Sequence, residues 1–173
     1  MRKHSKEKLY NNYTTSSSTK KSETQSGTSR ATSKIWVKKW VDYSSKYGLG
    51  YILSNGAAGV FFNDSTKIIL DIKGQKFNYI ERGPDRQDII QSHSLNDYPS
   101  ELQKKVTLLQ HFRSYLDDDK KKKENDQTNV VQSSKDHVYV KKWRREKHAI
   151  LFRLSNKVVQ VIFQDSTEIV LSS

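Results

Sequence analysis

A nine-residue stretch occurs twice in this chain, and the repetition constrains the fold more than any other feature. Residues 62–70, FNDSTKIIL, recur as residues 163–171, FQDSTEIVL. Two shorter matches precede them in the same order, at residues 53–55 and 154–156 and at residues 37–40 and 140–143. Each copy of an internal repeat is one structural unit that buries a face against its neighbour. The sequence therefore predicts two related units packed together.

The spacing between the matched segments differs at one place. The second and third segments are equally far apart in both copies, but Trp40 to Leu53 is two residues longer than Trp143 to Leu154. A difference in length confined to one place is typical of a hairpin loop.

The composition limits the classes of protein to which the chain can belong. With 173 residues, 34% hydrophobic and 29% charged, it forms one domain or two small ones. The absence of Cys excludes disulfides, thiolate metal sites and cysteine nucleophiles, and we expect an intracellular protein. No window has the roughly 18 consecutive apolar residues of a membrane-spanning helix, so no membrane partner is expected.

Half of the formal net charge of +12 lies at the N-terminus. Residues 1–34 hold eight Lys or Arg and two Glu, a net charge of +6, and are otherwise rich in Ser, Thr, Asn and Gln. Such a segment buries too little apolar surface to offset the entropy lost on ordering. We therefore expect a disordered basic tail over residues 1–34.

Segments rich in strand-favouring residues follow the tail. Trp36–Tyr43 and Tyr47–Ser54 predict a first hairpin, and Asn55–Gly56 is a strong two-residue turn signal. Four more strands are expected at residues 59–62, 66–70, 77–81 and 88–91. The pattern predicts a six-stranded antiparallel meander.

After these strands, the spacing of the apolar residues changes from that of a strand to that of a helix. Apolar residues recur at helical spacing at Leu102, Val106, Leu109, Phe112 and Leu116. Asp97 is the candidate N-cap, and Pro99 fits the first turn. An apolar stripe of this kind covers a sheet face, so residues 35–116 are predicted to form a sheet with one helix of roughly five turns.

A polar segment separates this unit from the second copy. Residues 117–137 include three Asp followed by four Lys, which is typical of a solvated linker. Residues 138–173 then predict strands at 138–142, 149–154, 158–163 and 167–171, with no counterpart of the later strands or the helix. We interpret the second unit as incomplete, through truncation of the sequence rather than pairing with another chain. The predicted fold class is α+β, mostly β.

The repeated segments and their surroundings resemble the tandem polo boxes of polo-like serine/threonine kinases. Residues 36–51 and 59–66 carry the likeness in the first unit, and residues 140–143 and 154–156 carry it in the second. It implies two polo boxes, each a six-stranded antiparallel sheet with one helix, that bind a Ser-phosphoThr or Ser-phosphoSer peptide in a shared groove. It also implies localisation to the nucleus, the centrosome or spindle pole, and the kinetochore.

The resemblance assigns roles to particular residues. Trp40 corresponds to a tryptophan that packs on the serine before the phosphoresidue, and Val41 and Asp42 correspond to residues that supply main-chain and polar contacts to that serine. Leu102 corresponds to a leucine that completes this pocket, and Arg145 to an arginine that lies along the peptide. These five residues are the predicted phosphopeptide-binding residues.

The pair of cations with which the family holds the phosphate does not carry over. The family has Asp-His-x-Lys where this chain has DSTE at residues 165–168. Ser166 can donate one hydrogen bond, but Glu168 would face a dianion with a like charge. The loss of one charge-assisted hydrogen bond weakens binding about ten- to a hundredfold. Basic residues within residues 141–147 are candidates to replace it.

Several functional classes are not supported by the sequence. A complete glycine-rich loop and the His-Arg-Asp and Asp-Phe-Gly motifs of a kinase are absent, so we predict a targeting module and not an enzyme. The histidines lack metal-ligand spacing, and neither a metal nor a cofactor is expected. Nucleic-acid binding would rest only on the tail and the lysine run, and is not expected. Trp36 and Trp143 are predicted to be core or inter-unit packing residues.

Two functions remain open. The first is phosphopeptide docking that localises a polo-like kinase in mitosis, with phosphorylated Ser/Thr proteins and a kinase domain of the parent protein as partners. The second is a divergent pair of boxes that binds proteins or dimerises without phosphate, which the residues at 166 and 168 motivate.

Overall fold

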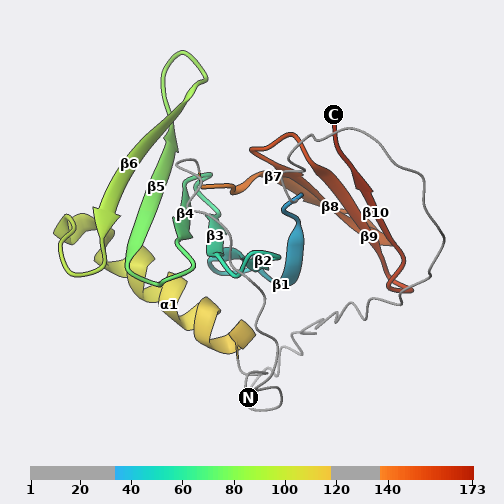
Figure 1. Cartoon of the computed structure of the whole chain (residues 1–173), viewed down its shortest axis with the longest axis horizontal. Coiled ribbons are helices and arrows are strands. Elements are labelled where there is room, and N and C mark those ends of the chain that lie inside the picture. Colours follow the sequence, from blue (N-terminus) through green and yellow to red (C-terminus); the bar gives the residue numbers. More distant parts are fainter. Residues whose placement is uncertain (1–33, 118–136) are drawn as a thin grey trace, which may run out of the picture.

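The computed structural model describes residues 34–117 and 137–173, which form two antiparallel sheets and one long helix (Figure 1). The first sheet has six strands in chain order: β1 (Val37–Tyr43), β2 (Gly48–Leu53), β3 (Ala58–Phe62), β4 (Lys67–Leu70), β5 (Lys76–Arg82) and β6 (Asp88–Ser94). The second has four, in the spatial order β10 (Glu168–Leu171), β9 (Val159–Phe163), β8 (Ala149–Leu154) and β7 (Val140–Arg145). The six-stranded meander and the four strands of the second unit are confirmed. The predicted tail except Lys34, and the predicted linker except Asp117 and His137, lie outside the described residues.

The first hairpins of the two sheets share an irregularity. The register shifts between Val37 and Lys39 in β1, and a shift occurs at the matching position of β7. Beyond this bulge the repeated tryptophan, Trp40 or Trp143, pairs with an aromatic residue of the next strand. The two-residue difference in length therefore falls at the turn end of the hairpin, as the spacing predicts.

Helix α1 (Gln103–Asp117) covers one face of the first sheet and follows a short 3₁₀ helix, η1 (Ser100–Leu102) (Figure 1). Its buried residues belong to the predicted apolar stripe. The prediction that Asp97 caps the helix is wrong: Pro99 is the N-cap residue of η1, and Asp97 forms a β-bridge with Ser94. Within residues 34–117 and 137–173, no helix has the length and apolar character needed to cross a bilayer.

Two hydrophobic clusters lie on opposite faces of the first sheet. One fills the space between the sheet and α1, and the other lies between the two sheets and includes Trp40 and Phe152. Trp143 packs against the second cluster, as predicted. Trp36 is 38% exposed, so its predicted packing role is wrong, because the adjacent Val37 takes the inward position.

The last repeated strand has a different environment in each copy. Ile68, Ile69 and Leu70 of β4 are fully buried, since β4 is flanked by β3 and β5. The matching residues of β10 are between 38% and 61% exposed, and no described strand pairs with its outer edge. The second unit is therefore incomplete in the described part of the chain.

Candidate peptide-binding site

Strand β1 lies between the two hydrophobic clusters, and its side chains alternate between them. Trp40 packs in the cluster between the sheets, whereas Val41 packs in the cluster beneath α1. Asp42 lies two residues after Trp40 and so shares its face of the strand. Trp40 and Asp42 are thereby placed at the junction of the two units.

An ion pair bridges this junction. Arg145, the last residue of β7, donates from Nη1 to Oδ2 of Asp42 at 2.7 Å. Ser44 donates its backbone N–H and its hydroxyl to Oδ1 of Asp42 at 3.0 and 2.6 Å. Partial burial alone would raise the pKa of Asp42, but the hydrogen bonds from Ser44 and Arg145 outweigh it and lower that pKa. Asp42 is therefore an ionised acceptor at neutral pH.

The indole of Trp40 is almost completely enclosed. The residue is 5% exposed, and its ring centroid lies 6.2 Å from that of Phe152 at an interplanar angle of 59°. Its Nε1 donor has no hydrogen-bond partner among the described residues. A buried donor without an acceptor costs free energy.

The structure does not bring Leu102 beside Trp40. Leu102 ends η1, is 6% exposed, and packs with Val41 in the cluster beneath α1. It therefore lies on the opposite side of β1 from the face that carries Trp40 and Asp42.

A cavity of about 360 Å³ lies on the helix side of β1. Its lining comes from the first hairpin and from α1: Val41, Tyr43, Tyr47, Leu108, His111, Phe112 and Tyr115. Aromatic and aliphatic walls of this kind accept an apolar side chain. Val41 is the predicted site residue that contributes to this lining.

The turn between β9 and β10 holds the residues that replace the cations of the family. Ser166 has a φ of 67°, and Ser65 has a φ of 68° at the matching turn of the first copy. The Oδ1 atom of Asp165 accepts the backbone N–H of Thr167 at 2.9 Å, which stabilises the turn. By the resemblance, a phosphate at this turn would meet Ser166 and Glu168 where the family has a histidine and a lysine.

Glu168 is tied to the inter-unit core through Gln160. The fully buried Gln160 donates from Nε2 to Oε1 of Glu168 at 2.5 Å. The same amide donates to the carbonyl of Val37 and accepts its N–H, both at 2.8 Å. Sequence reasoning missed Gln160, although a polar residue between the inward-facing Val158 and Ile162 was a usable signal.

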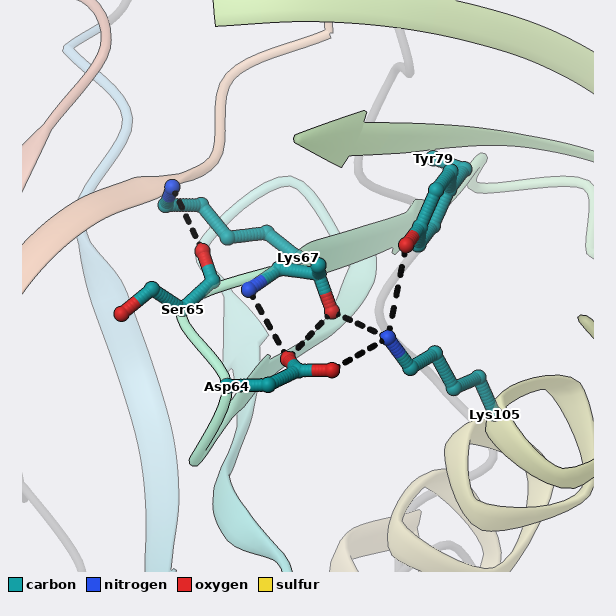
Figure 2. Close-up of polar contacts among 6 residues, drawn as sticks. Asp64, Ser65, Lys67, Tyr79 and Lys105 are labelled. Carbon is teal, nitrogen blue, oxygen red and sulfur yellow. Dashed lines mark hydrogen bonds and ion pairs between the residues drawn. The ribbon is translucent and has the colours of Figure 1, made fainter. Parts of the chain in front are cut away.

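Lysines do lie at the first copy of the turn, Lys67 in β4 and Lys105 in α1, but they are engaged within the unit (Figure 2). Lys105 of α1 donates from Nζ to Oδ2 of Asp64 at 2.7 Å and to the hydroxyl of Tyr79 at 3.3 Å. Lys67 is 2% exposed and donates to the carbonyl of Ser65 at 3.2 Å. The contacts of Lys105 connect α1 to the turn and to the sheet, and the contact of Lys67 stabilises the turn.

Two antiparallel sheets that share a core, with Trp40, Asp42 and Arg145 at their junction, define a class of tandem β-sheet domains. The family model described as "POLO box duplicated region" matches residues 45–106 and 146–173, which is more than half of the chain. The chain belongs to the polo-box family.

The similar curated proteins are kinases. The chain is 55% identical over 136 residues to a probable serine/threonine-protein kinase, CCRP1, of Zea mays, and 40% identical over 135 residues to the serine/threonine-protein kinase PLK1 of Xenopus tropicalis. The alignments cover 76% and 75% of this chain but 21% of each relative. The chain thus spans about a fifth of the length of the curated relatives it matches.

Solved polo-box structures share the fold. The Cdc5 polo-box domain of budding yeast in complex with an Spc72 phosphopeptide superposes with a TM-score of 0.69 at 28% identity, covering 85% of this chain and 55% of that chain. The same domain in complex with the Dbf4 polo-interacting region gives 0.68 at 26% identity, covering 86% and 56%. The polo-box fold implied by the sequence is confirmed.

Proposed function

We propose that this chain is the phosphopeptide-docking module of a polo-like serine/threonine kinase. The observation that most supports this function is the convergence of Trp40 and Asp42 from the first unit with Arg145 from the second. A pair of opposite charges at the junction of the two units suits a peptide that carries a polar residue next to a phosphate. The Cdc5 polo-box domain, similar in fold, is solved in complex with a phosphopeptide.

The proposed cellular role is targeting. The module would dock phosphorylated Ser/Thr proteins so that the kinase domain of the parent protein acts near them in mitosis. The proposed sites are the nucleus, the centrosome or spindle pole, and the kinetochore. This chain contributes binding and no catalytic step.

A titration with two matched peptides tests the proposal. Fluorescein-labelled Ser-Thr and Ser-phosphoThr peptides of the same sequence are titrated with the chain, and their anisotropy is followed. Tighter binding of the phosphorylated peptide is expected. Equal affinity for both peptides, or binding of neither, would refute phosphopeptide docking.

The second candidate function is protein binding or dimerisation without phosphate. It is favoured by Glu168, whose carboxylate occupies the position of a phosphate-binding lysine and bonds to Gln160. Equal affinity for the two matched peptides, or concentration-dependent dimers in sedimentation equilibrium, would support it.

A further inference from the structure

Arg145 of β7 lies opposite the face of β1 that carries Trp40 and Asp42. It pairs with Ile150 across the β7–β8 ladder, and Ile150 is buried in the cluster between the sheets. Arg145 therefore points toward the first unit, where it reaches Asp42. Its side chain is nevertheless 42% exposed, so a ligand can approach the guanidinium from solvent.

Asp42 does not depend on Arg145 alone for its hydrogen-bond donors. Ser44 donates two hydrogen bonds to Asp42 that do not involve Arg145. Asp42 thus keeps two donors when the guanidinium moves away. Asp42 has a single negative charge, whereas a phosphorylated residue has about −1.5 to −2 charges and three strong acceptor oxygens. A phosphate is the stronger partner for a planar guanidinium, which can donate to it in a bidentate fashion.

The position that holds phosphate in the family is unfavourable in this chain. Ser166 and Glu168 stand where the family has its histidine and lysine, and the Glu168 carboxylate bonds to the buried Gln160. The cations of the first copy, Lys67 and Lys105, are engaged with its own turn. A bound phosphate therefore needs a cation from another part of the junction between the two units.

We propose that Arg145 is the phosphate ligand of this domain: its guanidinium pairs with Asp42 while no peptide is bound and exchanges that carboxylate for the phosphate of a docked peptide. This inference rests on the proposed function, because it concerns the same junction and a phosphorylated ligand. An unphosphorylated peptide lacks the charge of the phosphate, and it therefore displaces Asp42 from Arg145 less readily.

The chain offers a matched control for this proposal in Arg144. Arg144 is the adjacent arginine in β7, pairs with Leu151 on the opposite face of the sheet, and forms an ion pair with Glu146. Replacing Arg144 with glutamine removes one positive charge, as the replacement of Arg145 does. It changes no contact at the junction of the two units. Arg144→Gln and Arg145→Gln therefore separate a specific contact from a general charge effect.

The test compares the preference for phosphate across variants of the full chain. The affinities of the matched Ser-Thr and Ser-phosphoThr peptides are measured for the unaltered chain, Arg145→Gln, Arg145→Lys and Arg144→Gln. We expect Arg145→Gln to lose the phosphate preference, a drop of about ten- to a hundredfold for the phosphopeptide, and Arg144→Gln to retain it. Arg145→Lys should keep part of the preference, since it retains a charge but not the bidentate fork.

The outcomes distinguish this inference from the proposed function. If the unaltered chain prefers the phosphopeptide and Arg145→Gln prefers it equally, Arg145 is not the phosphate ligand, while phosphopeptide docking stands. If the unaltered chain shows no preference, both are refuted. Thermal denaturation of each variant confirms folding, and the charge-conserving Arg145→Lys variant decides the question if Arg145→Gln does not fold.

Discussion

The hydroxyl of Tyr51 in β2 accepts a hydrogen bond from the backbone N–H of Val140 in β7 at 2.9 Å, so a buried tyrosine joins the two units. Gly59 in β3 makes room for the ring, because a Cβ there would lie 2.3 Å from Cζ of Tyr51. Burial raises the pKa of Tyr51, which keeps the hydroxyl protonated at all ordinary pH values. The packing of the two sheets thus depends on specific polar contacts as well as on apolar area.

Tyr51→Phe should destabilise the fold, because it leaves the N–H of Val140 without an acceptor in a buried site. We expect a loss of about 1–3 kcal/mol in the free energy of unfolding, measured by urea denaturation. Tyr98→Phe is the control, since the hydroxyl of Tyr98 donates to Gln103 at the exposed surface. Similar losses for the two variants would argue against the inter-unit hydrogen bond.

Gln160→Leu should be more damaging than its position on a second-unit strand suggests. The side-chain amide satisfies both the N–H and the carbonyl of Val37, and leucine would leave both buried groups unpaired. We expect a loss of about 2–4 kcal/mol in the free energy of unfolding. Gln164→Leu, which removes an exposed bond to the carbonyl of Lys147, should have a much smaller effect. An unchanged stability of Gln160→Leu would contradict the assignment.

Trp40 requires a conservative change if its role in binding is to be measured. Trp40→Ala would open a cavity beside Phe152 and cost about 3–5 kcal/mol, so weaker peptide binding could reflect unfolding. Trp40→Phe keeps an aromatic ring and removes the indole N–H that lacks a partner. We expect a smaller loss of stability than for Trp40→Ala, together with weaker phosphopeptide binding in calorimetry. Unchanged affinity would remove Trp40 from the site.

The stability of the first unit should fall in acid through Asp64. Partial burial alone would raise the pKa of Asp64, but hydrogen bonds from Lys105 and Thr66 outweigh it and lower that pKa (Figure 2). A carboxyl with a lowered folded-state pKa contributes stability above its unfolded pKa of about 3.9 and loses it as the pH falls through the folded value. Asp64→Asn should therefore be less stable than the unaltered chain at pH 7, with the gap closing toward pH 2 in urea titrations. A gap independent of pH would show that the ionisation of Asp64 contributes nothing to stability.

The sequence predicted the strands well and the contacts between the units poorly. The alternation in β1 and its repetition in β7 are local signals, and so is the helical spacing of the apolar residues in α1. Gln160 and Val37 are 123 residues apart, and no local pattern encodes their pairing. Asp42 and Arg145 were each predicted as peptide contacts through the resemblance, but their mutual ion pair follows only from the packing of the two sheets.

Local signals also failed where two of them competed. Aspartate is a residue type favoured at the N-cap, which is why Asp97 was predicted there. Instead, Pro99 precedes a 3₁₀ helix, and α1 begins only after that helix. Leu102 fits both the helical stripe and the likeness to a binding residue, and the structure places it in the core beneath α1. Leu102 is a core residue because the surrounding fold buries its side chain. Burial depends on residues distant in sequence, so local signals do not predict it.

The most direct test of the account is the location of a bound phosphopeptide. ¹H–¹⁵N spectra of the labelled chain, recorded with increasing Ser-phosphoThr peptide, report each backbone amide, the indole N–H of Trp40 and the side-chain Nε–H of Arg145. We expect the largest shift changes at Trp40, Asp42 and Arg145, with smaller changes for the unphosphorylated peptide. Changes confined to residues away from the junction, or identical changes with both peptides, would contradict the phosphopeptide-docking function.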